Sequence, residues 1–244
     1  MADAVHRFLV PGTLCDQRLF EPIRSHWRAH HPEVTAQVGD LHTLTEDPAA
    51  WCRAQLNELP PRFDLMGFSL GGVLGLMLLG LAAHRVRRLV LVASNPQAGT
   101  ALHRQRWEAQ WQHWTERGPR DLATHLYQAI TPETTRQPAV LDVLQRMAIA
   151  TPESSFRAQG ELNTRRPDGQ LALKPWSGPL LLISGGADPW CGADKQALFL
   201  NARPDAVWKE LPLSGHYLPL ENPIETAELS HAFFASSLPN ASTP

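Results

Sequence analysis

A serine at position 69 stands alone between two apolar segments, in the run FDLMGFSLGGVLGLMLLG that begins at Phe63. Residues Gly67 to Gly71, GFSLG, match the pattern G-x-S-x-G, which places a nucleophilic serine on a sharp strand-to-helix turn. The glycines leave room for that turn, and the N-terminal end of the following helix favours a developing oxyanion. The alternative is a tight turn with an incidental serine. Because an apolar strand pattern precedes Ser69 and a helix pattern follows it, we interpret Ser69 as a nucleophile.

A serine hydroxyl is a weak nucleophile until a base takes its proton. His216, in LPLSGHYLPLENP, lies between the last predicted strand and the last predicted helix. It follows Ser214 and Gly215, a flexible approach that lets the ring reach over the sheet. We therefore predict that His216 is the base, and we interpret most of the other histidines as surface, helix-end or packing residues.

The third member of such a site is an acid that holds the tautomer and orientation of the imidazole. Asp188 follows the fifth predicted strand in LLISGGADPWCGAD, at the strand end where α/β sheets place their sites. The chain order Ser, Asp, His also fits. The alternative for Asp188 is a helix N-cap or an Asp-Pro turn. Asp194 is the second choice for the acid, whereas Asp64 lies too far from the end of its strand.

Two backbone N–H groups are expected to form an oxyanion hole. The residue after the nucleophile, Leu70, supplies one of them, and the loop after the first strand supplies the other. That loop is VPGTLCDQRLF, in which Gly12 lets the backbone turn and the N–H of Thr13 is the candidate. The alternative is that Pro11 and Gly12 form an ordinary turn.

The elements that must position these residues alternate along the chain. Apolar or β-branched runs predict strands at residues 6–12, 33–38, 62–67, 86–94, 178–186 and 206–212. Helices are predicted after Asp47 as N-cap, over residues 70–83, and after Asn222 as N-cap. Several strands are apolar throughout, which indicates a mostly parallel sheet with helices on both faces.

The alternation stops between Pro96 and Leu173, where no strand pattern occurs. An amphipathic segment at residues 104–118 predicts a first helix, and further helices are predicted at residues 119–130, within residues 131–150 and at residues 151–162, which indicates an all-helical insertion. We therefore expect an α/β core formed by residues 1–96 and 173–244, and a helical cap formed by residues 97–172.

Composition sets limits on the function. Of 244 residues, 43% are hydrophobic and 19% charged, which predicts a packed globular domain. The net charge of −2 gives no electrostatic reason to expect nucleic acid or an anionic membrane as partner. The N-terminus lacks a secretion-signal pattern, and the three cysteines show neither disulfide nor zinc spacing, so a reducing cytoplasm is the expectation. No pattern calls for a metal or an organic cofactor, and none indicates an oligomeric state.

With these pieces assembled, the chain resembles the α/β-hydrolase superfamily from end to end. LVPGTLCDQRLF is similar to its strand and HG loop, LMGFSLGG to its nucleophile elbow, SGGADPWC to its acid loop, and SGHYLPLENP to its histidine loop with a following Glu-x-Pro. The resemblance is to small capped bacterial members, such as the biotin-pathway pimeloyl-ester carboxylesterase and the menaquinone-pathway SHCHC synthase. It implies the roles assigned above and acyl chemistry at a serine. Two departures stand out: Pro11 replaces the usual histidine of the HG loop, and the usual first hairpin is missing, which implies a six-stranded sheet.

Aromatic residues are candidates for the substrate pocket. Three tryptophans of the insertion fall on one helical face: Trp107, Trp111 and Trp114. They form either an apolar lid over the substrate or a surface that packs the insertion against the core. Three other aromatic residues flank the predicted catalytic positions: Phe68, Trp190 and Tyr217. Four arginines of the insertion are further candidates, for an anionic substrate end, although such charges are usually solvated: Arg104, Arg106, Arg165 and Arg166.

Three functions follow as hypotheses. The first is a serine hydrolase of a small carboxylic ester or thioester. The second is a lyase or C–C bond enzyme that uses the same triad, which a pocket rich in arginines would favour. The third is a ligand-binding protein on a hydrolase fold, for which a complete triad would serve no purpose. Fold-level analogy does not choose among substrates.

Overall fold

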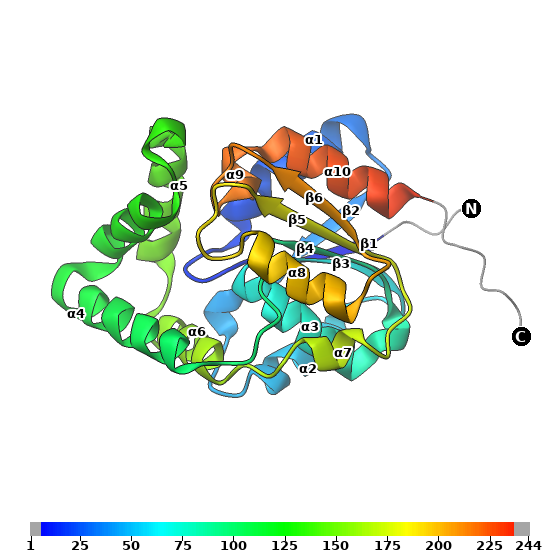
Figure 1. The fold of residues 1–244 in the computed structure, drawn as a ribbon, viewed down its shortest axis with the longest axis horizontal. Coiled ribbons are helices and arrows are strands. Elements are labelled where there is room, and N and C mark those ends of the chain that lie inside the picture. Colours follow the sequence, from blue (N-terminus) through cyan, green and yellow to red (C-terminus); the bar gives the residue numbers. More distant parts are fainter. Residues whose placement is uncertain (1–5, 237–244) are drawn as a thin grey trace, which may run out of the picture.

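The computed structural model describes residues 6–236 and contains one six-stranded sheet (Figure 1). Its strands are β1 (His6–Val10), β2 (Thr35–Val38), β3 (Phe63–Phe68), β4 (Val86–Val92), β5 (Leu180–Gly185) and β6 (Val207–Leu211). They lie in the order β2-β1-β3-β4-β5-β6, and every neighbouring pair is parallel. The six predicted strands are confirmed. The sheet was predicted to be mostly parallel, and it is entirely parallel.

Burial follows the position of each strand in the sheet. All residues of β3 and β5 are buried, which agrees with their mostly apolar sequences and includes the polar side chains of Asp64 and Ser184. The edge strands β2 and β6 are instead largely half-buried or exposed. The parallel arrangement brings the carboxyl ends of all six strands to one edge of the sheet, where the loops that carry the candidate residues begin.

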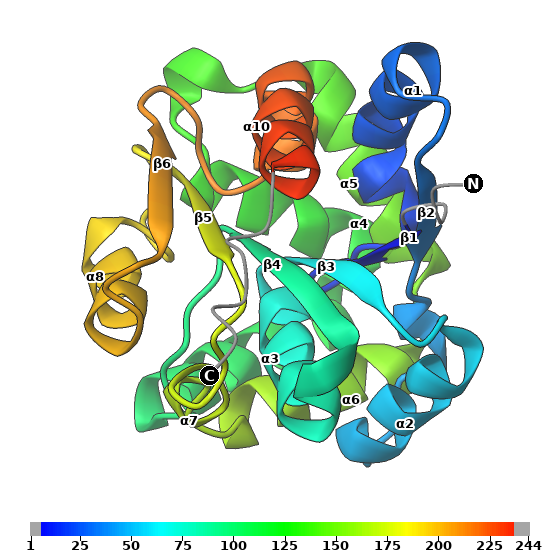
Figure 2. The ribbon, with the colours of Figure 1, turned by 90° about the vertical axis from the view of Figure 1, so that its right-hand side faces the viewer.

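Helices cover both faces of the sheet. They are α1 (Glu21–His30), α2 (Pro48–Glu58), α3 (Leu70–Ala82), α8 (Ala193–Ala202), α9 (Leu218–Glu221) and α10 (Pro223–Ala235). Figure 2 shows α1 and α10 on one face and α2 and α3 on the other. Asp47 caps α2 as predicted, because its side chain accepts the N–H of Ala50. Asn222 also occupies the N-cap position of α10, but its side chain accepts no capping hydrogen bond.

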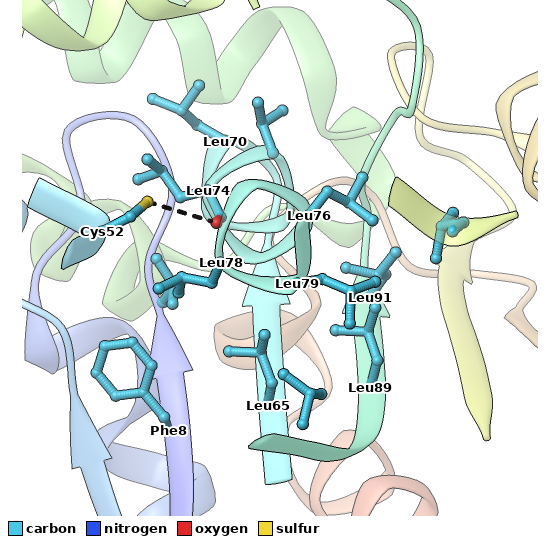
Figure 3. Close-up of a cluster of buried hydrophobic side chains, with 14 of the residues drawn as sticks. Phe8, Cys52, Leu65, Leu70, Leu74, Leu76, Leu78, Leu79, Leu89 and Leu91 are labelled. Carbon is cyan, nitrogen blue, oxygen red and sulfur yellow. Dashed lines mark hydrogen bonds between the residues drawn. The ribbon is translucent and has the colours of Figure 1, made fainter. Parts of the chain in front are cut away.

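Helix α3 is the central element of one hydrophobic layer. Its leucines meet side chains from β3 and β4, among them Leu65 and Leu89 (Figure 3). On its other side the thiol of Cys52 on α2 lies 3.9 Å from the carbonyl oxygen of Leu74. A helix that is apolar all round is stable only when it is buried, which explains this uninterrupted sequence. The burial fixes α3 on the sheet and thereby fixes the turn at its N-terminus.

The segment between β4 and β5 contains helices and loops but no strand. It contains α4 (Ala101–Ile130), α5 (Pro138–Ala150), α6 (Glu153–Arg165) and α7 (Gln170–Leu173). The long α4 is two helices joined at a kink, because Gly118 has φ 82° and Pro119 follows it. Figure 1 shows α4 and α5 beyond the end of the sheet toward which the strands run.

Within residues 6–236, no helix has both the length and the apolar character that a membrane crossing requires. The three cysteines are buried and free.

Two glycines of α3 give opposite predictions for the same substitution. A Cβ on Gly71 would lie 2.0 Å from the carbonyl oxygen of Val10, so Gly71→Ala must push β1 and α3 apart and should cost about 1–3 kcal/mol or more. A Cβ on Gly80 would lie 3.7 Å from the Cβ of Ala172, an ordinary contact. Gly80→Ala should therefore stabilise the helix by about 0.5–1 kcal/mol. Urea unfolding of both variants checks this, and equal effects would contradict the packing described here.

Candidate active site

Ser69 lies between β3 and α3 in a strained backbone conformation. Its φ is 52° and its ψ is −117°, in a region that costs a non-glycine residue about 1–3 kcal/mol. The surrounding chain holds it there: its N–H donates to the carbonyl oxygen of Val92 at 2.9 Å, and the hydroxyl of Ser94 donates to its carbonyl oxygen at 3.1 Å. The strain and the close glycine packing at Gly67 and Gly71 fit a turn built to present the serine.

His216 connects Ser69 to Asp188. Its Nε2 lies 3.0 Å from the Oγ of Ser69, and its Nδ1 lies 2.7 Å from the Oδ2 of Asp188. An ionised carboxylate only accepts hydrogen bonds, so the proton of a neutral imidazole belongs on Nδ1. That tautomer leaves the lone pair of Nε2 facing the serine hydroxyl. The arrangement can therefore take a proton from Ser69 and hold the resulting imidazolium beside a carboxylate.

The carboxylate of Asp188 is buried and fully bonded. Its Oδ1 accepts the N–H groups of Trp190 at 2.8 Å and Cys191 at 3.1 Å, while Oδ2 faces His216. Burial by itself raises the pKa of Asp188, but the charge and hydrogen bond of His216 and the two backbone donors outweigh it, so the pKa lies below its ordinary value of 3.8. The carboxylate is thus held ionised at neutral pH.

The other two aspartates weighed from the sequence lie elsewhere. Asp194 is on α8 with its side chain 72% exposed, and it pairs with Lys195 at 2.8 Å. Asp64 is completely buried beside Arg87 and Arg88, near the start of β3. Neither hydrogen-bonds to His216, which leaves Asp188 as the only described carboxylate on the imidazole.

Glu221 holds the loop that carries His216. Its carboxylate accepts the N–H of Gly215 at 2.6 Å, the N–H of Tyr217 at 3.0 Å and the hydroxyl of Thr131 at 3.2 Å. Thr131 directly follows α4, so this carboxylate ties the histidine loop to the helical insertion. Sequence reasoning did not assign Glu221 a role, although the Glu-x-Pro after the histidine marked its position.

The loop after β1 is also supported by the insertion. Thr13 and Leu70, the two predicted oxyanion donors, both line the same cavity as Ser69. Leu14 has φ 59°, and its N–H donates to the Oε1 of Gln159 on α6 at 2.9 Å. Gln159 is completely buried and donates in turn to the hydroxyl of Ser155. This buried amide, which sequence reasoning missed, supports a loop that has Pro11 in place of the expected histidine.

The cavity next to Ser69 is lined by only some of the predicted aromatic residues. Phe68, Trp190 and Tyr217 line it together with His216. The rings of Phe68, Trp190 and Tyr217 lie 5.2, 5.6 and 5.5 Å from the imidazole of His216, measured between centroids. These three aromatic side chains therefore surround the imidazole of His216 at the cavity wall.

The three tryptophans of α4 do not line this cavity. Trp107 and Trp114 pack against Phe156 of α6 with ring centroids 5.0 and 4.5 Å away, and Trp111 lies under the guanidinium of Arg157. Large aromatic surfaces at this spacing stabilise helix packing. The structure therefore corrects the pocket assignment of Trp107, Trp111 and Trp114: they join α4 to α6.

Polar groups that sequence reasoning did not place at the site complete the cavity lining, among them His103, which was interpreted from the sequence as a surface or packing residue. These are Asn95, His103, Gln110 and Asn163, with Arg106 and Arg166 from the four arginines considered. Arg104 and Arg165 are exposed and lie outside the lining. The cavity thus has an apolar part around His216 and a polar, basic part contributed by the insertion.

Two groupings in the described chain bring three potential metal ligands within 4.8 Å: Asp188, Cys191 and His216, and a second one of His31, Glu33 and His231. In the group of Asp188, Cys191 and His216, the aspartate and the histidine already form a hydrogen bond with each other. Burial also raises the pKa of the Cys191 thiol well above its ordinary value. In the second, the guanidinium of Arg7 donates to His231. Both arrangements favour hydrogen bonding over a cation.

Comparison with known proteins agrees with this architecture. The sequence profile of the alpha/beta hydrolase family matches residues 8–229. Among solved structures, the enol-lactonase from Burkholderia xenovorans LB400 superimposes with a TM-score of 0.81 at 18% identity, covering 96% of this chain and 93% of that one. A thermophilic esterase from Thermogutta terrifontis superimposes with a TM-score of 0.78 at 18% identity, covering 94% of this chain and 89% of that one. MenH from S. aureus superimposes with a TM-score of 0.78 at 15% identity, covering 96% of this chain and 94% of that one. No curated protein sequence matches the chain significantly.

Replacing Asp188 by asparagine should lower the free energy of unfolding at neutral pH, and the deficit should shrink in acid. The folded pKa of Asp188 lies below its unfolded value, so its carboxylate stabilises the fold above the unfolded pKa, and that stabilisation is lost as the pH falls through the folded pKa. Urea unfolding of wild type and Asp188→Asn between neutral pH and about pH 3 measures the difference. Asp142→Asn, which removes an exposed carboxylate paired with Arg146, is the control. A deficit for Asp188→Asn that grows toward acid pH would contradict the assignment.

Proposed function

The chain belongs to the alpha/beta hydrolase family, and we propose that it hydrolyses a small carboxylic ester or thioester through an acyl-enzyme intermediate. One observation carries this proposal: the continuous hydrogen-bond chain from the Oγ of Ser69 through His216 to Asp188, at 3.0 and 2.7 Å. The roles that follow are Ser69 as nucleophile, His216 as general base and acid, and Asp188 as the acid that orients the imidazole.

In the first half of the proposed reaction, Nε2 of His216 takes the hydroxyl proton while Oγ of Ser69 attacks the substrate carbonyl carbon. The negative charge that develops on the carbonyl oxygen is stabilised by the backbone N–H groups of Leu70 and Thr13. The tetrahedral species collapses, His216 gives its proton to the departing alcohol or thiol, and the acyl group stays on Ser69. Two easier steps thereby replace one difficult step.

In the second half, water enters and Nε2 of His216 takes one of its protons. The hydroxide attacks the acyl carbon, the bond to Oγ of Ser69 breaks, and the proton returns to that oxygen. The acid product leaves and the site is restored. Asp188 stays ionised throughout and stabilises the imidazolium formed in each half.

The cavity supports a small substrate. It encloses about 80 Å³, whereas sites for drug-sized ligands usually enclose about 300–1,000 Å³. The insertion contributes much of the lining, including Leu126 from α4 and Arg166 from the segment after α6. We therefore propose that residues 97–172 act as a cap over Ser69 that limits the length of the acyl group.

A second function uses the same three residues without net hydrolysis. A lyase or C–C bond enzyme would use His216 as the base toward a carbon acid. The sequence resemblance to the menaquinone-pathway SHCHC synthase and the structural likeness to MenH suggest this alternative. The arginines that line the cavity, Arg106 and Arg166, favour this alternative because they suit an anionic substrate. A ligand-binding protein without catalysis is the weakest of the three hypotheses, since it leaves the ordered Ser69, His216 and Asp188 without a purpose.

Hydrolysis of a p-nitrophenyl ester series from acetate to palmitate tests the proposal. We expect turnover of the short acyl chains, a sharp fall for the long ones, and a loss of about 10⁴-fold or more in kcat for Ser69→Ala. Ser25→Ala, at an exposed serine on α1, is the matched control and should keep full activity. Folded wild-type protein that turns over none of the esters, or a Ser69→Ala variant as active as wild type, would contradict the esterase proposal.

A further inference from the structure

Arg166 is a buried cation on the wall of the cavity that holds Ser69. Its exposed fraction is 7%, and burial lowers its pKa from the ordinary value. It lies at the C-terminal end of α6, inside the helical insertion. A buried charge is costly unless an opposite charge or a full set of acceptors compensates it. The partners of Arg166 therefore show what the site is built to receive.

Every partner of Arg166 in the described chain is neutral. Its Nε donates to the carbonyl oxygen of Gln97 at 2.9 Å and its Nη1 to the Oδ1 of Asn163 at 2.9 Å. Its Nη2 lies 2.8 Å from the Nε2 of His103. No aspartate or glutamate of residues 6–236 forms an ion pair with it. The neighbouring Arg165 behaves as a surface arginine usually does, because it is exposed and pairs with Glu161 at 3.1 Å.

The contact with His103 leaves one donor without an acceptor. The N–H of Thr100 donates to the Nδ1 of His103 at 3.0 Å, and the hydroxyl of Thr100 lies 2.9 Å from the same nitrogen. A neutral imidazole has one nitrogen that accepts, and here it is Nδ1. The Nε2 then carries a proton and faces Nη2 of Arg166, which also carries protons. Two N–H donors thus meet on the cavity wall.

The charges around this pair are positive. Burial, Arg166, Arg106 and Lys195 together lower the pKa of His103 to about 4, so the ring is neutral at pH 7. Arg106 lines the same cavity and lies 5.8 Å above the ring of Trp190. No carboxylate is among the described residues that line the cavity. Amide groups of Asn163 and Gln110 supply further polar contacts there.

We propose that Arg166, His103 and Arg106 form a subsite for a carboxylate group of the substrate, so that the ester cleaved at Ser69 has a negatively charged acid part. A carboxylate oxygen accepts from Nη2 of Arg166 and Nε2 of His103 at once, which resolves the two facing donors. It also supplies the counter-charge that the buried guanidinium lacks. This subsite rests on the proposed hydrolysis at Ser69 and narrows its substrate to half-esters of short dicarboxylic acids or their thioesters.

Matched ester pairs test the subsite. The monomethyl esters of succinate, glutarate and adipate carry the carboxylate, and methyl butyrate, valerate and hexanoate are their neutral counterparts of equal chain length. The readout is the ratio of kcat/KM for each pair, from the methanol released. Wild type should prefer the charged ester at one or more lengths by about tenfold or more, and Arg166→Met should reduce that preference by about 10- to 100-fold, as expected for a lost charge-assisted hydrogen bond.

Three further variants complete the test. Arg166→Lys should recover part of the preference because it keeps the charge. Arg165→Met removes an exposed neighbouring arginine and should leave the ratio unchanged. Because Arg106 is exposed, Arg106→Met should keep the fold and lower the preference even if Arg166→Met unfolds. A wild-type preference for neutral esters, or an unchanged ratio in Arg106→Met and in folded Arg166→Met, would overturn the subsite.

A binding measurement separates this subsite from the proposed hydrolysis. Glutarate is titrated calorimetrically into Ser69→Ala and into the double variant Ser69→Ala/Arg106→Met. Tighter binding to the single variant supports the subsite even if wild type cleaves no ester, in which case only the hydrolase proposal fails. Equal affinities, or no binding to either, overturn the subsite even if neutral esters are cleaved.

Discussion

The hydrogen bond between Nδ1 of His216 and Oδ2 of Asp188 is the interaction on which the proposed chemistry depends. It fixes the tautomer, and the tautomer decides whether Nε2 can accept the proton of Ser69. An isolated buried carboxylate would become protonated. Asp188 stays ionised because two backbone N–H groups and the imidazole compensate its burial. This side-chain hydrogen bond therefore couples the loop after β5 to the loop after β6, and the backbone N–H of Ala187, which donates to the carbonyl oxygen of Ser214 at 3.1 Å, joins the same two loops.

The helical insertion supports the loops of the site as well as lining its cavity. Gln159 of α6 accepts the N–H of Leu14 in the loop after β1, and Thr131 at the end of α4 donates to Glu221, which holds the histidine loop. Arg166 adds a cation to the cavity wall. The positions of the loop that carries Thr13, of the loop that carries His216 and of the basic lining thus depend on how α4 and α6 pack. The aromatic cluster around Phe156 joins those two helices, which gives the tryptophans of α4 a role remote from the substrate.

The sequence predicted the elements whose signals are local. Apolar or β-branched runs located all six strands, and Asp47 and Pro48 marked the start of α2. Gly118 and Pro119 divide α4 where two helical segments were expected. Ser69, Asp188 and His216 could be chosen because each follows a predicted strand, and parallel strands bring such positions to one edge.

The missed features depend on contacts between distant segments. Gln159 and Leu14 are separated by 145 positions, and no pattern in either segment indicates their contact. Arg165 and Arg166 are neighbouring residues of the same type, yet Arg166 is buried on the cavity wall and Arg165 is exposed. Likewise, the spacing of the three tryptophans on one helical face is the same for a lid and for a packing surface, and only the position of Phe156 decides between them.

Covalent labelling with a fluorophosphonate, followed by mass spectrometry of the digested protein, tests the central claim most directly. Such probes react with a serine whose proton is removed by a neighbouring base. The account predicts one label per chain, on the peptide that contains Ser69, with labelling abolished in Ser69→Ala and strongly slowed in His216→Ala. A folded wild-type protein that remains unlabelled, or a label on another serine that persists in Ser69→Ala, would contradict it.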